Sequence, residues 1–325
     1  MNCFLGVDVG SVSTNIILMD EETNVLESMY LRTQGKPIVT VQRGLQDLAG
    51  RLKPGWHIRA AGTTGSARHL TSVIMGADSV KNEITAHAVA ATHLVPGAQT
   101  VLEIGGQDSK IIVLRNGVVA DFAMNTVCAA GTGSFLDQQA ARLNIPIEDF
   151  GPIALEAKSP VRIAGRCSVF AESDMIHKQQ MGHNLSDILA GLCEALVRNY
   201  LNNVGKGKEI LGPVVFQGGV AANVGIKKAF EEALEVEVQI PKHYDVMGAV
   251  GAALLAREAV AKGQPSKFKG FEAAQEDYRA GSFECGDCPN LCEVIEIAAG
   301  EKTIARWGDR CSKWANSVMA EESAV

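Results

Sequence analysis

The feature that most restricts the fold is an internal repeat of a strand, a glycine turn and a second strand. The two copies span residues 3–20 and 100–115. When they are aligned without a gap, Asp8 matches Glu103 and Gly10 matches Gly105. A turn of this kind brings backbone amides close to a phosphate, while the acid at the end of the first strand can hold a water ligand of Mg²⁺. One copy alone would be weak evidence for phosphate binding, but the two copies together predict two hairpins that contact phosphate.

The segments around this repeat have the patterns of an α/β protein. The expected elements are a helix at 36–51, a strand running into a glycine turn at 58–65, and two helices of small residues at 82–93 and 241–256. The two small-residue helices are able to pack closely on each other. We expect His87 and His93 to be packing or surface residues of the first of them.

Residues 125–137 combine a run of small residues with the start of a helix. Amides at a helix N-terminus, together with the positive end of the helix dipole, favour an anion such as a phosphate. Cys128 lies at the same helix N-terminus, where a thiolate is stabilised. For a single cysteine, a small buried side chain in a tight turn is the more ordinary interpretation.

A second cysteine, Cys167, repeats the arrangement, because Ser168 after it is an N-cap candidate for another helix. Neither Cys128 nor Cys167 belongs to a CxxC pair. Two thiolates per chain cannot enclose a four-iron cluster or a structural zinc ion. A two-fold symmetric dimer would supply four.

Composition narrows the class of protein. The formal charge of −7 and the lack of a clustered basic face argue against broad nucleic-acid binding. The longest apolar run, 246–256, is too short to span a bilayer, and the chain opens directly on a strand and not on a signal peptide. We therefore expect a cytoplasmic protein, in which 8 cysteines indicate metal or redox chemistry more than disulfides.

Two further segments carry specific expectations. Residues 186–201 form an amphipathic helix with Cys193 on its apolar side, as expected of a core residue. A strand at 212–217 then ends in Gly218 and Gly219. This pair could lie flat against a purine and ribose, or could simply make a tight turn before the next helix.

The order of these elements resembles the actin, sugar-kinase and heat-shock-chaperone ATPase superfamily. Three motifs are closer to one branch of it, the ATP-dependent activases of 2-hydroxyacyl-CoA dehydratases and the related ATPase subunits of benzoyl-CoA reductase. These motifs begin at Glu103 (Glu-Ile-Gly-Gly-Gln-Asp), Cys128 (Cys-Ala-Ala-Gly-Thr-Gly-Ser-Phe-Leu-Asp) and Cys167 (Cys-Ser-Val-Phe-Ala-Glu-Ser). The resemblance covers about residues 3–260, and kinases and chaperones of the superfamily lack the two cysteine motifs.

The resemblance implies a homodimer that binds one 4Fe–4S cluster through Cys128 and Cys167 of both chains. Each chain would bind MgATP between two ribonuclease-H-like lobes. A reduced ferredoxin or flavodoxin would load one electron, and ATP hydrolysis would drive its transfer at low potential to a CoA-ester dehydratase or reductase. The implied lobes are residues 1–95 and 96–262, with a helix at 244–262 that could pack back on the first lobe.

By motif position, the resemblance assigns Asp8 and Glu103 to Mg²⁺ and water positioning. We further hypothesise that Gln107 orients the attacking water, since a neutral amide does not repel the γ-phosphate. Phosphate contacts are expected from Gly10, Ser11, Ser13, Thr14, Gly105, Gly106, Gln107 and Asp108. Closure of the phosphate site is expected from Gly131, Thr132, Gly133 and Ser134, and contact with adenosine from Gly218 and Gly219.

Residues 263–325 extend beyond short members of this family, and resemble pieces of much longer fused members. They hold four cysteines, Cys285, Cys288, Cys292 and Cys311, around a predicted hairpin at 293–307. Four thiols there suit a tetrahedral zinc site or a second iron–sulfur cluster. The alternative is a set of reduced surface thiols.

Two other functions compete with ATP-driven electron transfer. A small-molecule kinase of the same superfamily would need a catalytic carboxylate, for which Asp108 is available. Such a kinase would have no use for thiols at the N-termini of two helices. A nucleotide-gated binding protein would need a peptide-binding domain, and the extension is too small and too rich in cysteine to be one.

Overall fold

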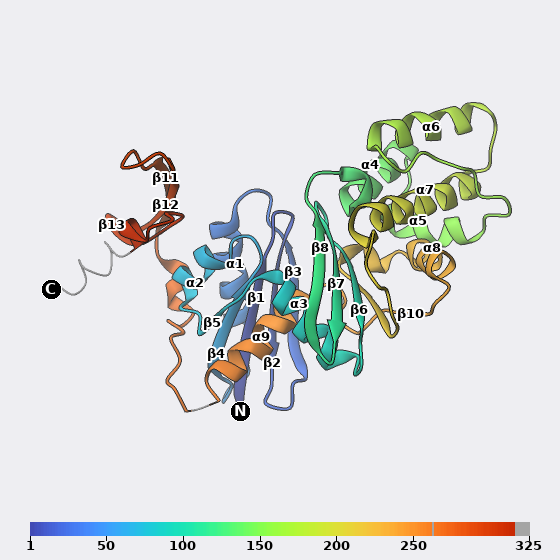
Figure 1. The fold of residues 1–325 in the computed structure, drawn as a ribbon. Helices are drawn as coiled ribbons and strands as arrows, with labels where there is room; N and C mark the ends of the chain where they lie inside the picture. Colours follow the sequence, from blue (N-terminus) through green and yellow to red (C-terminus); the bar gives the residue numbers. More distant parts are fainter. Residues whose placement is uncertain (262, 316–325) are drawn as a thin grey trace.

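The computed structural model describes residues 1–261 and 263–315, which form two lobes, each built on a five-stranded sheet, and a smaller three-stranded sheet (Figure 1). The first sheet has the order β3-β2-β1-β4-β5 and the second β10-β9-β6-β7-β8. The strands of the first are β1 (Asn2–Val9), β2 (Ser13–Met19), β3 (Val25–Arg32), β4 (His57–Thr64) and β5 (Ser79–Val80). Those of the second are β6 (Thr100–Ile104), β7 (Ser109–Arg115), β8 (Val118–Asn125), β9 (Val214–Gln217) and β10 (Val238–Gln239).

The two sheets share one plan, which includes the two hairpins that the internal repeat predicts. In the first, β1, β2 and β3 form an antiparallel meander and β4 pairs parallel with β1. In the second, β6, β7 and β8 form the meander and β9 pairs parallel with β6. The hairpins even close in the same way, since the Gly10 amide donates to the Ser13 carbonyl at 2.9 Å and the Gly105 amide to the Asp108 carbonyl at 3.0 Å.

Two helices of small residues, α3 (Glu83–Leu94) and α9 (Met247–Ala259), fill the space between the sheets. The hydrophobic core around these helices includes Phe4 from one face of β1 and Val101 from one face of β6. A side chain at Gly251 of α9 would collide with the Ala86 carbonyl of α3, so this close approach requires glycine. The expected close packing of these two helices is confirmed.

The outer face of each sheet is covered by other helices. Leu5 and Val7 of β1 pack with α1 (Pro37–Ala49) and α2 (Arg68–Met75) on the first sheet. The second sheet carries α4 (Gly133–Leu143), α5 (Ile147–Leu155), α6 (Ser168–Gln180), α7 (Leu185–Tyr200) and α8 (Val224–Leu234). Single turns η1 (Ala129–Gly131) and η3 (Gly219–Ala222) precede α4 and α8, and a π-helical turn, η2 (Leu201–Gly205), continues α7.

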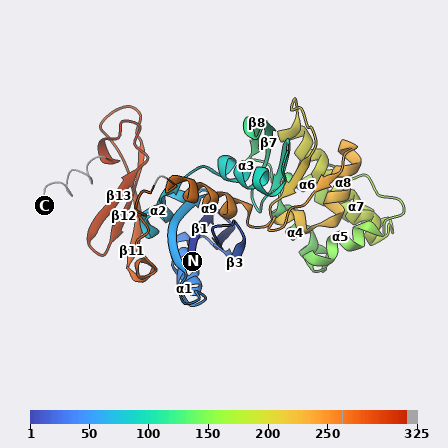
Figure 2. The ribbon, with the colours of Figure 1, turned by 90° about the horizontal axis from the view of Figure 1, so that it is seen from below.

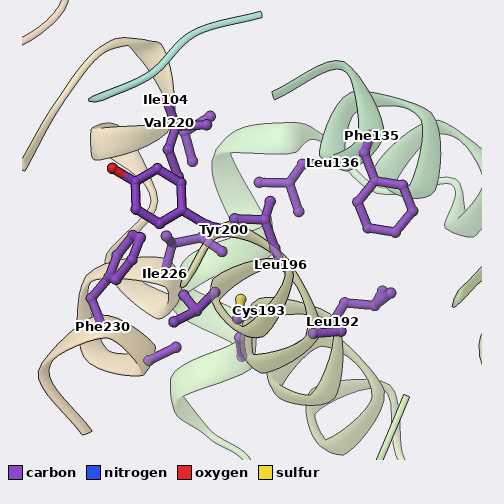
Figure 3. Packing of buried hydrophobic residues seen from close by; sticks show 14 of the residues in the cluster. Ile104, Phe135, Leu136, Leu192, Cys193, Leu196, Tyr200, Val220, Ile226 and Phe230 are labelled. Atoms are coloured by element: carbon purple, nitrogen blue, oxygen red, sulfur yellow. The ribbon is translucent and has the colours of Figure 1, made fainter. Parts of the chain in front are cut away.

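The core under these helices is packed around aromatic side chains of α7 and α8. Figure 3 shows Tyr200 of α7 beside Phe230 and Ile226 of α8, and the two rings meet edge to face with centroids 5.2 Å apart. Cys193 is 2% exposed within this cluster. The expectation that Cys193 is a core residue is confirmed.

The C-terminal extension lies against the first lobe, on the side away from the second (Figure 2). After the turn η4 (Glu272–Gln275) it forms an antiparallel sheet of β11 (Tyr278–Glu284), β12 (Glu293–Ala299) and β13 (Lys302–Trp307). The predicted hairpin is therefore confirmed as β12 and β13, whereas β11 was not predicted. Ala274, Tyr278 and Ile297 are buried in the same core as α1 and α2. In the described part of the chain, no helix is both long and apolar enough to cross a membrane.

Candidate functional site

A cleft of about 370 Å³ opens between the two sheets, at the turns that end β1 and β6. Most residues that the sequence assigns to nucleotide binding line it: Asp8, Gly10, Ser11, Ser13, Glu103, Gly105, Gly106, Gln107, Asp108, Gly133, Gly218 and Gly219. Thr14, Gly131, Thr132 and Ser134 do not line it. The Thr14 hydroxyl instead lies 3.0 Å from the Thr33 hydroxyl in the protein interior. The two glycine hairpins and the Gly218–Gly219 turn are thus brought together around one cavity.

The N-terminus of α4 corrects one expectation. The amides of Gly133 and Ser134 are not bare, because they donate to the carbonyls of Gly105 and Gly106, both at 2.9 Å. The Thr132 amide is also taken, by the Ala129 carbonyl at 3.1 Å. This helix end therefore holds the second glycine turn in place, and does not offer those amides to a phosphate.

Four of the carboxyl groups that line the cleft, those of Asp8, Glu83, Glu103 and Asp108, interact with one ammonium group, that of Lys110. The Lys110 ammonium lies 2.9 Å from carboxylate oxygens of both Glu103 and Asp108, and 3.8 Å from Glu83. Although burial opposes it, these three carboxylates raise the pKa of Lys110 above its ordinary value. Burial and the nearby Glu83 raise the pKa of Asp8 to about 7, and burial raises that of Glu103 to about 7 against the attraction of Lys110. A divalent cation would balance the excess of carboxyl groups over the single ammonium.

Lys110, Glu83 and His87 are parts of this site that the sequence reasoning missed. A signal for Lys110 was available, since it precedes the apolar run Ile111–Leu114 in a strand that is buried at every position but the last. A lysine in such a strand must find a carboxylate partner. Glu83 carried no comparable signal, because an acid in the first turn of a helix is ordinary.

His87 lines the cleft from α3 while only 7% exposed. Burial and the Lys110 charge lower the pKa of His87 to about 3, so the ring is neutral. Its Nδ1 atom lies 2.8 Å from the amide nitrogen of Gln217 and accepts that hydrogen bond. His93 matches the surface expectation, with its Nε2 atom 3.0 Å from the Thr23 hydroxyl.

Cys128 and Cys167 lie close together on the second lobe, before the helices α4 and α6 (Figure 1), which the Arg142–Glu172 ion pair joins. Cys128 precedes η1 and Cys167 precedes α6, and both side chains are half-buried. The Cys128 sulfur is 3.7 Å from the carbonyl of Arg166, the residue before Cys167. The structure therefore brings the two predicted ligands to one surface.

The apolar side chains next to these cysteines face solvent. Val127 is 96% exposed, and Val169 and Phe170 are each 67% exposed. Exposed apolar groups gathered in one place are typical of a surface that another protein covers.

The C-terminal cysteines are not arranged as a metal site. Cys285 is buried, Cys292 half-buried, and Cys288 and Cys311 are exposed. The Cys285 sulfur accepts a hydrogen bond from the Trp314 indole at 3.3 Å. Among residues 1–261 and 263–315, no three His, Cys, Asp or Glu side chains gather closely enough to hold a metal ion. The hairpin is present, but the structure does not assemble the four thiols that the sequence placed around it.

Two relatives are similar to this chain in sequence. The chain is 36% identical, over 79% of its length and 98% of the relative, to the (R)-2-hydroxyglutaryl-CoA dehydratase activating ATPase of Acidaminococcus fermentans. It is 29% identical to a subunit of benzoyl-CoA reductase from Thauera aromatica, over 78% of this chain and 93% of the relative.

Two solved structures extend the likeness to the fold. One is the activator of 2-hydroxyisocaproyl-CoA dehydratase from Clostridium difficile with bound ADPNP, with a TM-score of 0.74 and 31% identity over 80% of this chain and 97% of that one. The other is component A of the A. fermentans dehydratase, with a TM-score of 0.73 and 32% identity over 80% of this chain and 100% of that one. Residues 5–256 match the family model, so this chain belongs to the BadF/BadG/BcrA/BcrD ATPase family.

Proposed function

We propose that this protein hydrolyses ATP to drive an electron from ferredoxin or flavodoxin, through a 4Fe–4S cluster, into a CoA-ester dehydratase or reductase. The observation that carries the proposal is a hydrogen-bonded contact between the nucleotide cleft and the helix that follows Cys128. The carbonyls of Gly105 and Gly106, in the turn at the nucleotide cleft, accept hydrogen bonds from the first residues of α4, just after Cys128. A kinase of similar fold has no use for this link to a thiol.

In the cleft, Asp8 and Glu103 would hold Mg²⁺ and its water ligands, and Lys110 would fix Glu103 and Asp108 in place. Gly10, Ser11 and Ser13 of the first turn and Gly105 to Asp108 of the second would contact the phosphates. Gln107 is exposed on the cleft wall, where it could orient the attacking water. Gly218 and Gly219 would face the adenosine.

The cysteine pair fits a cluster shared between two chains. Thiolates are the ligands that iron–sulfur clusters take, and one chain supplies two of the four needed. The exposed Val127, Val169 and Phe170 surround the pair and would be covered in a two-fold symmetric dimer. When bound, the cluster would accept and give up one electron at a time. All eight cysteines are unpaired, in keeping with the reducing cytoplasm that we propose as the location.

The link between the sites would carry the effect of ATP. A change in the contacts of the Gly105–Asp108 turn must move the carbonyls on which Gly133 and Ser134 depend. That movement would reach Cys128 through the turn η1, which joins Cys128 to α4 and is closed by the hydrogen bond from the Thr132 amide to the Ala129 carbonyl.

The test is an assay of iron, acid-labile sulfide and zinc on anaerobically purified protein, beside its ATPase rate. We expect about four irons and about four sulfides per dimer, with a brown colour. A colourless, iron-free protein that transfers the γ-phosphate to a small molecule would refute electron transfer and favour the kinase.

Nucleotide binding should also depend on pH. Asp8 and Glu103 have pKa values near 7, raised by burial, and must lose their protons to bind Mg²⁺. Affinity for Mg·ADPNP is therefore expected to rise between pH 6 and 8, by about tenfold for each carboxyl that must ionise. In the absence of nucleotide, the stability of the protein should change with pH in the opposite direction. The folded state holds protons that the unfolded chain has lost, so the free energy of unfolding falls as pH rises from the ordinary carboxyl pKa towards 7.

Calorimetric titrations at several pH values would measure this effect. Asp8→Asn is the matched variant, because it removes one of the two titrating groups and should flatten the dependence on pH. Equal affinity of the wild-type protein across the range would contradict the prediction.

A further inference from the structure

Helix α7 lies behind both cysteine loops. The segment that leads to Cys167 runs along it: the Val161 amide donates to the Asp187 carbonyl at 3.1 Å, and the Arg198 guanidinium donates to the Ile163 carbonyl at 2.6 Å. A side chain at Gly165 would lie 2.8 Å from the Ala195 carbonyl, so this loop rests directly on the helix. One rigid element thus sets where Cys167 stands.

Asn199, in the last turn of α7, joins that loop to the other cysteine. Its side-chain nitrogen donates to the Cys128 sulfur at 3.5 Å and also to the Gly165 carbonyl. Its side-chain oxygen accepts from the Asn203 amide at 2.8 Å. A backbone carbonyl only accepts hydrogen bonds, so Gly165 fixes which end of the Asn199 amide faces the cysteines. Asn199 is 3% exposed, so its side chain is held by these hydrogen bonds and by the residues packed around it.

The next residue, Tyr200, connects the same turn of α7 to the nucleotide cleft. Its hydroxyl donates to the Lys110 carbonyl at 2.6 Å, and the side chain is fully buried. The ammonium group of Lys110 in turn binds Glu103 and Asp108. Neighbouring residues of one helix thus contact a cysteine sulfur and the strand that carries the nucleotide-site lysine.

We propose that Asn199 is a positioning residue for the iron–sulfur cluster, which holds the Cys128 and Cys167 loops together and donates a hydrogen bond to the Cys128 sulfur. Tyr200 makes that contact sensitive to the nucleotide site through β7. The inference rests on the proposed function, since it needs a cluster at these cysteines. This route through α7 is separate from the contact of the Gly105–Gly106 turn with α4.

A hydrogen bond to a cluster sulfur favours the reduced state, which carries one more negative charge. Its removal should shift the midpoint potential to a more negative value. The loss of the bridge between the loops should also weaken retention of iron. If Asn199 merely supported the fold, its replacement would lower the melting temperature without a specific shift in the midpoint potential.

The experiment is a redox titration of the anaerobically purified dimer with dithionite, followed by the electron paramagnetic resonance signal of the reduced cluster. Asn199→Leu removes the donor at similar size. Asn199→Asp keeps the shape and the acceptor for Asn203, and in its ionised form it cannot donate and adds a negative charge beside Cys128. Asn202→Ala is the matched control, because this exposed asparagine lies three residues further along. We expect a more negative potential, or iron loss at an unchanged melting temperature, in both Asn199 variants and neither effect in the control.

The outcomes separate this inference from the proposed function. Wild-type protein without iron would overturn both. Wild-type protein with iron, together with an Asn199→Leu protein that keeps its iron and its potential, would overturn the role of Asn199 alone.

Tyr200→Phe tests the connection to the nucleotide. In the wild-type protein we expect the potential to differ between the ADP and ADPNP states, and the variant should reduce that difference while it retains iron. An unchanged difference in Tyr200→Phe would overturn the link through β7.

Discussion

Replacement of Cys128 by serine is expected to remove essentially all iron from the protein, about four atoms per dimer. Each dimer would lose two of its four cluster ligands at once. A serine hydroxyl has nearly the shape of the thiol, but stays protonated at neutral pH and is a poor ligand for iron. The fold should survive, because Cys128 is only half-buried and lies at the surface of the second lobe. Iron and sulfide content of anaerobically purified protein, with circular dichroism as a check on folding, would measure the effect.

The control for this variant is Cys288→Ser, in the C-terminal extension, where an exposed thiol is replaced. We expect that protein to keep its iron. Iron that persists in Cys128→Ser would place a cluster elsewhere, and the extension would be the first region to search. Zinc that persists there would identify a zinc site in the extension, which the arrangement of its thiols in this structure does not favour.

The sequence was most informative where a pattern is repeated. The acid–glycine turns recur in two segments, and a repeated local pattern predicts a repeated local structure, here two hairpins closed by equivalent hydrogen bonds. The two small-residue helices were predictable for a similar reason, since runs of alanine and glycine allow only close packing.

Contacts between distant segments could not be predicted in this way. The amides at the start of α4 were expected to face a phosphate, and local pattern alone gives no means to see that Gly105 and Gly106 supply acceptors for them. The sequence of β7 could indicate that Lys110 needs a carboxylate partner, but it could not name the partners, because they come from α3 and from the two sides of the β6–β7 turn. Asn199 likewise acquires its role only when α7 is placed behind two loops.

Gly248→Ala is expected to lower the ATPase rate on the order of 100-fold, close to the effect of Asp8→Asn, since misplacing a group that stabilises transition-state charge costs about that much. Alanine normally stabilises a helix relative to glycine, and Gly248 lies inside α9, so propensity alone predicts a more stable protein. The structure nevertheless predicts a loss of activity, because a methyl group at Gly248 would collide with one carboxylate oxygen of Asp8. The same contact reaches further than the carboxylate tip, because the added methyl group would also come within 2.8 Å of the Asp8 Cγ atom, so Asp8 would have to leave its place in the cleft.

The Gly248→Ala prediction separates a damaged site from a damaged fold. Gly281→Ala, in β11, is the control, because a side chain there would meet open space. We expect Gly248→Ala to keep the iron content of the wild-type protein, since Cys128 and Cys167 belong to the other lobe, and to lose affinity for Mg·ADPNP. Full ATPase activity in Gly248→Ala would show that Asp8 is not held as the structure indicates, and would remove Asp8 from the proposed metal site. Loss of iron together with activity would instead mean that the two sites depend on each other even without nucleotide.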